Sequence, residues 1–350
     1  MSKELVGFGP SLVDINATLE PSVYEKCRDI LSIEPGGWQN ISNYDTLKQL
    51  LETIVDDDIP HLDVESMQRY KHIALRAGST ILGMFGAMHP AQRQHSHLMT
   101  VLAIHDGVDD SFSSFFVSVV RQAGIRHYKQ LEEGHNPLGV VLNVKDDGEK
   151  TLAMYPGVAS ELEDCDEFLT ILKPDCVFID TYELQEGKLS TYLDNLIRSN
   201  SYRVALSLGN HKVIYGELLC SLRHYIEQGY IDILCGNEQE FSALYPDLDL
   251  GMTTQEGFEQ HPVRDNVPYI LLTRGAMGLS THWKKRYINM RAHPLQNNHI
   301  VTTSGAGDTT MGVYCSGIIE DKDPIETLKK ATYLATTVLQ VASSMIIANE

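Results

Sequence analysis

Apolar residues along most of the chain occur in short runs that alternate with amphipathic stretches. In the C-terminal part, the runs at 175–182, 202–209, 231–237 and 268–275 are rich in apolar residues and end in polar residues or glycine. Stretches with helical spacing lie between them. Apolar strands that alternate with helices predict a mostly parallel sheet covered by helices on both faces. The expected fold class is therefore α/β, with a doubly wound sheet.

The N-terminal part predicts a smaller β structure. Residues 4–15 are typical of a first strand followed by a loop. Between 136 and 156, two apolar or alternating runs flank an Asp-Asp-Gly turn at 146–148, which is a strong hairpin signal. We find no internal repeat or long linker, so we expect residues 1–350 to form a single domain with a small β appendage.

Composition limits the partners and the compartment. The chain has 28 Lys and Arg residues against 47 Asp and Glu residues, a net charge of −19. This balance disfavours nucleic acid and anionic membranes as partners, but a local pocket can still hold an anionic small molecule. The first residues lack a secretory signal, and no apolar run approaches the roughly 20 residues that a bilayer requires. Scattered cysteines without a CxxC pair indicate a reducing compartment, so we expect a soluble, cytoplasmic protein.

Two weaker patterns leave other classes of protein open. The GFGPSL turn at 7–12 begins like the GxGxxG fingerprint of dinucleotide-binding enzymes, but Leu12 replaces the third glycine. It is the only support for an oxidoreductase. Three histidines at 89–97 have no Cys or acidic residue at a recognised metal spacing, so an exposed polar loop is the expected interpretation.

The strongest chemical signal is the stretch GAGD, Gly305 to Asp308, which precedes a small-residue segment of helical character. A glycine turn that opens a helix directs backbone N–H groups outward, where the helix dipole favours an anion such as a phosphate. Asp308 beside this turn can take the proton of an attacking hydroxyl group. The alternative is that Asp308 only N-caps the helix.

Two further motifs follow predicted strands. Asn237 and Glu240 are three residues apart, and their oxygens suit a hydrated Mg²⁺. Residues 273–278 form another glycine turn. Ligands of doubly wound sheets bind at the C-terminal ends of the strands, a rule that also points to Asp180 and Gly209.

Taken together, these motifs resemble the PfkB/ribokinase family of carbohydrate and nucleoside kinases. In that family N-x-x-E, T-x-G-x-x-G and G-A-G-D motifs follow one another in the C-terminal third. Residues 9–15 resemble the family's first strand, and residues 139–162 resemble the stretch that builds its lid. The resemblance implies a ribokinase-like fold, with a lid formed by about 15–40 and about 136–156.

The resemblance also implies an activity: transfer of the γ-phosphate of ATP, with Mg²⁺, to a hydroxyl group of a nucleoside or a sugar. The branch of inosine–guanosine and adenosine kinases is the nearer match, and the sugar kinases are the alternative. A homodimer paired through an exposed edge of the lid is a further expectation.

The family motifs assign a role to each matching residue. The implied roles are general base for Asp308, anion hole for Gly305, Ala306 and Gly307, acceptor binding for Asp14, Gly78 and Ser79, nucleotide binding for Asn237, Thr273, Gly275 and Gly278, and a water-mediated Mg²⁺ contact for Asn237 and Glu240.

The chain departs from the family pattern at two places. The family's Gly-Gly stretch, with an asparagine four residues on, matches 76–86, where the asparagine position falls on Leu82 or Gly83. The family's aspartate three residues before the anion-hole glycine is Thr302, so a monovalent cation does not carry over. The altered acceptor motif motivates a second hypothesis, a ligand-binding or regulatory protein on the same fold with little turnover.

Overall fold

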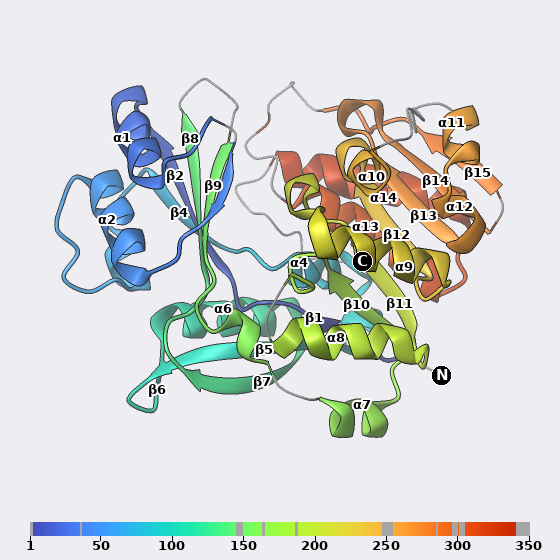
Figure 1. Cartoon of the computed structure of the whole chain (residues 1–350), viewed down its shortest axis with the longest axis horizontal. Helices are drawn as coiled ribbons and strands as arrows, with labels where there is room; N and C mark the ends of the chain where they lie inside the picture. The colour runs from blue at the N-terminus through green and yellow to red at the C-terminus, as the bar shows by residue number, and fades with distance from the viewer. Residues whose placement is uncertain are drawn as a thin grey trace.

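The chain folds into two β-sheets with helices packed around them (Figure 1). The computed structural model describes residues 3–35, 37–144, 150–162, 165–185, 188–246, 255–284, 286–295, 300 and 305–340. In Figure 1 the smaller sheet stands on the left, and the larger sheet extends below it and to its right.

The larger sheet is mostly parallel. Its described strands run in the spatial order β15-β14-β13-β12-β11-β10-β1-β5-β6, with β7 beside β5. The strands are β1 (Leu5–Phe8), β5 (Ser96–His105), β6 (Val108–Asp109), β7 (Arg126–Glu133), β10 (Cys176–Asp180), β11 (Arg203–Ser207), β12 (Ile233–Asn237), β13 (Tyr269–Thr273), β14 (Leu279–Trp283) and β15 (Arg286–Met290). Neighbouring strands from β13 to β7 pair in parallel, whereas β14, β15 and β6 are antiparallel additions. The prediction of a mostly parallel sheet is confirmed.

Helices cover both faces of this sheet. The described helices are α1 (Pro21–Leu31), α2 (Tyr44–Val55), α3 (Val64–Gln68), α4 (Thr80–Ala87), α5 (Pro90–Arg93), α6 (Ser111–Ala123), α7 (Asp166–Leu172), α8 (Lys188–Ser199), α9 (Gly216–Glu227), α10 (Glu238–Leu244), α11 (Gln255–Gln260), α12 (Val263–Asn266), α13 (Ala306–Ile319) and α14 (Pro324–Leu339). Phe178 of β10 lies in a hydrophobic cluster with residues of α4, α13 and α14. Its neighbours Val177 and Ile179 lie in a second cluster with residues of α8 and α9. A strand that is apolar on both faces is typical of a doubly wound sheet.

The smaller sheet joins segments that are far apart in the sequence. Its order is β3-β9-β8-β2-β4, with β2 (Val13–Leu19), β3 (Trp38–Asn40), β4 (Ile73–Ala77), β8 (Leu138–Val144) and β9 (Lys150–Tyr155). Strands β8 and β9 pair antiparallel, which confirms the predicted hairpin. Its expected turn at 146–148 lies outside the described residues.

Alternation along β2 gives the smaller sheet two different faces. Val13, Ile15 and Ala17 are fully buried in one hydrophobic cluster with residues of α1 and α2. Because successive side chains of a strand point to opposite faces, Asp14 and Asn16 lie on the other face. Asp14 lines a cavity together with Asp180 at the end of β10, so it is available for a site between the two sheets.

Some elements differ from the sequence prediction. Residues 4–15 form two strands, β1 and β2, which belong to different sheets. Strand β4 joins the smaller sheet although it lies outside the segments expected for the lid. The edge strand β7 was not predicted because its sequence, RHYKQLEE, is largely polar.

The histidine-rich segment 89–97 is only partly exposed, so the expectation of an exposed loop was wrong for its second half. His89 is exposed and N-caps α5. His95 and His97 each hydrogen-bond a different carboxylate oxygen of Glu4 at 2.8 Å, and His97 is buried. These two histidines therefore tie β5 to the start of β1.

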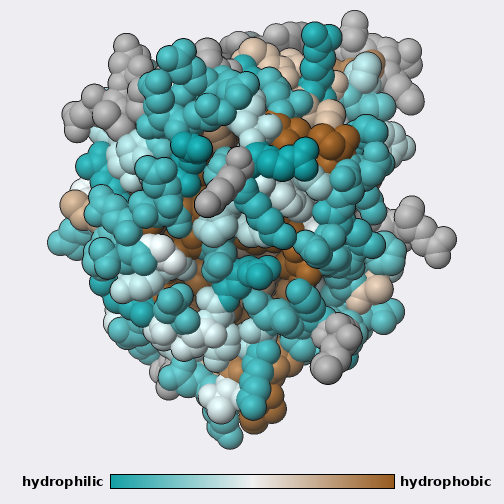
Figure 2. Space-filling model, turned by 90° about the vertical axis from the view of Figure 1, so that its right-hand side faces the viewer, coloured by the Kyte–Doolittle hydropathy of each residue, from teal (hydrophilic) through white to brown (hydrophobic). Residues whose placement is uncertain are grey.

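The molecular surface gives limited information on partners. The face drawn in Figure 2 is mostly hydrophilic, and hydrophobic residues show there in recesses and small patches. None of the described helices combines the length and the apolar character needed to span a bilayer. All six cysteines are free thiols. A homodimer stays a prediction.

Candidate active site

Asp14 occupies a slot made by two glycines. The strand register places it opposite Gly139 of β8, and Gly78 follows β4 next to it. A Cβ atom on Gly139 would lie 2.3 Å from Asp14 Oδ1, and one on Gly78 would lie 2.6 Å from the same carboxyl group. Any other residue at either position would displace the carboxyl group, so these glycines fix where Asp14 points.

The first turn of α4 lies beside Asp14. Ser79 is the N-cap residue, and its hydroxyl accepts a hydrogen bond from the Leu82 N–H at 3.4 Å. Leu82 is 1% exposed and packs into the core, whereas Gly83 lines the cavity described below. Of the two candidates for the family's asparagine position, Gly83 is therefore the one that faces the site.

The GAGD turn opens α13. Gly305 is the N-cap, with φ of 82°, a left-handed conformation that favours glycine. Ala306, Gly307 and Asp308 are the first three helical residues, so the alternative that Asp308 N-caps the helix is wrong. No described side chain caps this helix start. Its first N–H groups are consequently available for an anion.

Close packing of α4 against α13 fixes Asp308. A Cβ atom on Gly312 of α13 would lie 2.1 Å from the carbonyl oxygen of Met84. A Cβ atom on Gly83 would lie 3.1 Å from the Cβ atom of Asp308. Glycines at these contacts let the two helices approach closely, and this approach brings Asp308 next to the start of α4.

These elements enclose a cavity of about 250 Å³. Of the residues predicted from sequence, it brings together Asp14, Gly78, Ser79, Gly305 and Asp308. Residues not assigned a role by sequence also line it, among them Trp38, Thr80, Gly83, Gly139, Asp180, Tyr182, Glu183 and Gly209. Sites for drug-sized ligands span about 300–1,000 Å³, so this cavity suits a group of monosaccharide size.

Asp308 has a strongly altered acidity. Burial raises its pKa from 3.8 to about 7, and the charges of Asp180, Glu240 and Asp14 add to the shift. Burial and like charges both disfavour the ionised form of a carboxyl group. A group that gains and loses a proton near neutral pH is suited to general-base catalysis.

Asp180, at the end of β10, is the main site residue to which the sequence gave no role. Its Oδ1 accepts hydrogen bonds from the N–H groups of Tyr182 and Glu183, at 2.9 and 3.3 Å, and its carboxyl group is also bonded to the Thr80 side chain. Burial raises its pKa. The strand-end rule pointed to Asp180, but no sequence signal distinguished Glu183.

Asn237 and Glu240 form a capping box at the start of α10. Asn237 Oδ1 accepts from the Glu240 N–H at 2.9 Å, and Glu240 accepts from the Asn237 N–H at 2.8 Å and from Asn237 Nδ2 at 2.7 Å. Burial raises the pKa of Glu240 to about 7. The pair does not line the cavity, although the charge of Glu240 reaches Asp308.

The donor set of this capping box is compatible with a hydrated cation. In the described part of the chain, no three His, Cys, Asp or Glu residues are grouped so as to hold a metal ion directly. The oxygens of Asn237 and Glu240 retain lone pairs beyond the capping bonds, and Mg²⁺ is often held through its water shell. A contact through water therefore fits these residues, whereas a direct protein cage does not.

The turn at 273–278 lies beside the capping box. Thr273, the last residue of β13, pairs with Asn237 in the parallel ladder. Gly275 is exposed, with φ of 52°. Gly278 has φ of 95°, and a Cβ atom there would lie 2.1 Å from the carbonyl oxygen of Met290, so the tight turn itself requires glycine. These residues follow the same sheet edge but do not line the cavity.

Two further features, Arg274 and the GFGPSL turn at 7–12, have structural roles. Arg274 forms an ion pair with Glu238 at 3.2 Å, which favours a structural role over a phosphate contact. The GFGPSL turn at 7–12 leads into β2, whereas a dinucleotide fingerprint requires a helix after the turn. The oxidoreductase alternative thereby loses its support. Thr302 lies outside the described residues.

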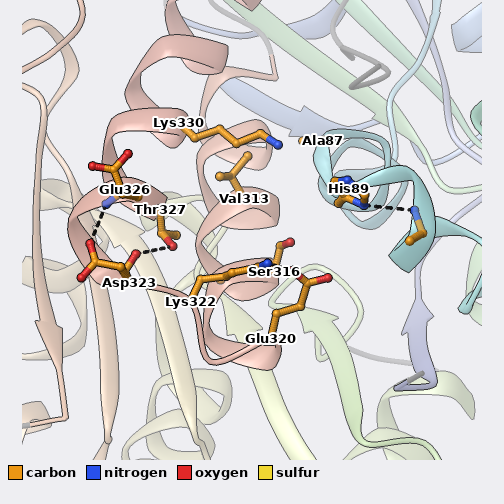
Figure 3. A pocket seen from close by; sticks show the side chains of 12 residues that line it. Ala87, His89, Val313, Ser316, Glu320, Lys322, Asp323, Glu326, Thr327 and Lys330 are labelled. Atoms are coloured by element: carbon orange, nitrogen blue, oxygen red, sulfur yellow. Dashed lines mark hydrogen bonds and ion pairs between the residues drawn. The ribbon is translucent and has the colours of Figure 1, made fainter. Parts of the chain in front are cut away.

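A larger hollow of about 520 Å³ lies between α13, α14 and the α4–α5 connection (Figure 3). None of the residues predicted as site residues lines it. Asp323 there accepts hydrogen bonds from the Glu326 N–H and the Thr327 hydroxyl, so its oxygens serve the start of α14. We therefore place the candidate active site in the cavity between Asp14 and Asp308.

A doubly wound sheet whose strand ends meet an open helix N-terminus with a carboxyl group in its first turn is typical of a ribokinase-like α/β protein. Residues 108–349 match the model of the pfkB family of carbohydrate kinases, and the chain belongs to this family. The family predicted from the sequence motifs is confirmed.

Solved structures give the same fold. The chain is similar to adenosine kinase from Sinorhizobium meliloti, with a TM-score of 0.78 and 16% identity over 99% of this chain and 97% of that one. It is also similar to adenosine kinase from Schistosoma mansoni in complex with 2-fluoroadenosine, with a TM-score of 0.74 and 15% identity over 99% and 98% of the two chains. At such identities the likeness shows the fold alone.

One curated relative matches over a shorter stretch. The chain is 31% identical over 107 residues to the protein named "Putative 1-phosphofructokinase" of Mycoplasma pneumoniae. This match covers 30% of the present chain and 35% of that protein, so the chain spans about a third of the relative's length.

Proposed function

We propose that the chain is an ATP-dependent kinase that transfers the γ-phosphate to a hydroxyl group of a nucleoside or a sugar. The single observation that carries the proposal is the cavity with Asp14 at the smaller sheet and Asp308 at the start of α13. An acceptor bound by Asp14 would present a hydroxyl group to Asp308 in a site of suitable volume.

Asp308 is the general base of this proposal. Its pKa, raised to about 7, lets it take the acceptor's proton as the oxygen attacks the phosphorus, and a positioned base contributes about 100- to 10,000-fold to such rates. The open N–H groups at Gly305, Ala306 and Gly307 would hold the oxygens of the transferring group. Proton transfer and anion binding then come from adjacent residues of one helix turn.

The nucleotide would lie along the neighbouring strand ends. Thr273, Gly275 and Gly278 follow β13, and Asn237 and Glu240 start α10 beside them. Bound Mg²⁺ would offset the charge of the phosphates, and Asn237 and Glu240 would hold it through water. The smaller sheet would act as a lid, because the face that carries Asp14 forms one wall of the cavity.

A coupled assay of ADP release over a panel of nucleosides and sugars tests the proposal. The wild type is expected to turn over at least one acceptor, and Asp308→Asn is expected to lower kcat by about 100-fold or more. Asp45→Asn, an exposed carboxylate in the first turn of α2, is the matched control. Binding of a nucleoside without turnover of any acceptor would instead support the regulatory alternative, which the glycine at position 83 motivates.

A further inference from the structure

Glu183 is a buried carboxyl group without a described partner. It lies three residues after the end of β10, in a turn held by the hydrogen bonds of the Tyr182 and Glu183 N–H groups to Asp180. Glu183 is 8% exposed to solvent. Within the described residues its carboxyl group makes no hydrogen bond or ion pair, although its backbone is fixed.

The carboxyl oxygens of Glu183 are not among the fully buried, unpaired polar atoms of the described residues, so they open onto the cavities that Glu183 lines. Burial and the charge of Asp180 raise the pKa of Glu183 well above its ordinary value. A buried, unpaired carboxyl group at a cavity wall therefore points to a ligand that supplies the missing hydrogen bond.

Glu183 stands where two cavities meet. One is the acceptor cavity with Asp14 and Asp308, and the other is a neighbouring cavity of about 310 Å³. Both are lined by Trp38, Tyr182 and Glu183. A ligand held in the first cavity can therefore extend into the second past Glu183.

The second cavity has the walls of a site for a planar ring. The rings of Trp38 and Tyr182 lie 6.3 Å apart at an interplanar angle of 39°, and Met154 and several prolines complete the apolar lining. Glu183 is one of the few polar groups there. Apolar and aromatic walls with a few placed polar groups are typical of sites for heterocycles.

The charges of both cavities disfavour an anionic acceptor. Neither lining contains a lysine or an arginine among the described residues, whereas carboxyl groups line both. A sugar phosphate would meet carboxyl groups without a compensating cation. A free sugar would fill the first cavity and leave the aromatic second cavity empty.

We propose that Glu183 determines the acceptor's class by hydrogen-bonding an N–H group of a planar nitrogen heterocycle, which occupies the second cavity while the sugar hydroxyl reaches Asp308. The inference rests on the proposed kinase function and deepens it, because it selects nucleosides over free sugars. Glu183 is a specificity residue that contacts the part of the acceptor remote from the reaction.

The test compares inosine with 1-methylinosine, which lacks the ring N–H, and with free ribose. Calorimetry gives Kd, and ADP release gives kcat and KM, for the wild type, Glu183→Leu, Glu183→Gln and the exposed control Glu167→Gln. In the wild type, inosine is expected to bind about 10- to 100-fold more tightly than 1-methylinosine, which corresponds to about 1.4–2.8 kcal/mol for one hydrogen bond.

Glu183→Leu is expected to remove this preference by weakening inosine alone, with the larger effect on KM than on kcat. Glu183→Gln retains an acceptor oxygen and is expected to fall between the leucine variant and the wild type. Glu167→Gln should match the wild type. If the ratio of the Kd for 1-methylinosine to the Kd for inosine were the same in Glu183→Leu as in the wild type, the inference would be overturned. A wild type that binds ribose more tightly than inosine would also overturn it.

These measurements distinguish a failure of the role proposed for Glu183 from a folding defect and from a failure of the kinase proposal. Since leucine removes an unpaired polar group, Glu183→Leu is expected to have a Tm at or above that of the wild type. If the wild type selects inosine in calorimetry but phosphorylates no acceptor, the kinase proposal fails while the role of Glu183 stands. If it phosphorylates acceptors without regard to the N–H group, the kinase proposal stands and the role of Glu183 fails.

Discussion

Replacement of Asp308 by asparagine should make the protein more stable at alkaline pH while it removes the base. Burial and neighbouring charges raise the pKa of Asp308 from 3.8 to about 7. This rise in pKa corresponds to about 4 kcal/mol between the two protonation states of the carboxyl group. Because the folded pKa is the higher one, the protonated carboxyl group contributes this stability fully below about pH 4, and the contribution is lost as the pH rises through about 7.

The helix dipole favours the ionised form of Asp308, but this stabilisation is smaller than the cost of burying the charge. A carboxylate in the first turn of a helix gains about 0.3–1 kcal/mol from the helix dipole, which asparagine would forfeit. Asp308 is also partly exposed to the cavity, which reduces the cost of its charge. We therefore expect Asp308→Asn to exceed the wild type by about 2–3 kcal/mol in free energy of unfolding near pH 8, and to equal it near pH 4.5.

Urea unfolding at the two pH values measures this difference directly. Asp45→Asn, in the first turn of α2, is the control, because its carboxylate is exposed and its effect should stay within about 0.5 kcal/mol at both pH values. If Asp308→Asn were less stable than the wild type by the same amount at both pH values, Asp308 would be an ordinary helix-stabilising carboxylate. Its proposed titration near neutral pH would then be refuted.

Three other substitutions test the construction of the site. Gly139→Ala places a Cβ atom 2.3 Å from Asp14 Oδ1, so steady-state kinetics should show KM for the acceptor raised by about tenfold or more; an unchanged KM would contradict a substrate role for Asp14. Asn237→Ala removes the capping box and should lower the free energy of unfolding by about 0.5–2 kcal/mol in urea titrations, whereas a neutral result would show that the cap carries no stability. Gly312→Ala forces α13 away from Met84 and should cost about 1–3 kcal/mol together with a lower kcat; full activity would mean that the close approach does not position Asp308.

The larger sheet was predictable because its strands carry strong local signals. Strands such as β10, with the sequence CVFID, are apolar on both faces, and glycines or polar residues end them. The edge strand β7 lacks that signal because its side chains are mostly polar or charged. Strand β4 was missed for another reason: its place beside β2 is set by pairing over a long sequence distance, which periodicity does not report.

The site was predictable where one short motif carries both geometry and chemistry. In GAGD the glycine with positive φ, the open helix start and Asp308 are consecutive, so the sequence indicated them together. Glu183 had no such motif. Its burial and its position between two cavities depend on β3 and β9 of the smaller sheet. Strand β3 lies more than 100 residues before Glu183 in the sequence, and β9 lies about 30 residues before it. Gly139 likewise acquires its role only through its register with Asp14.

A crystal structure with an acceptor identified by the ADP-release panel and a non-hydrolysable ATP analogue tests the proposed active site most directly. The acceptor is expected in the cavity between Asp14 and Asp308, with a hydroxyl group about 2.6–3.2 Å from the Asp308 carboxyl group, within reach for proton transfer. An acceptor bound in the hollow between α13 and α14, or bound with its hydroxyl groups turned away from Asp308, would contradict it.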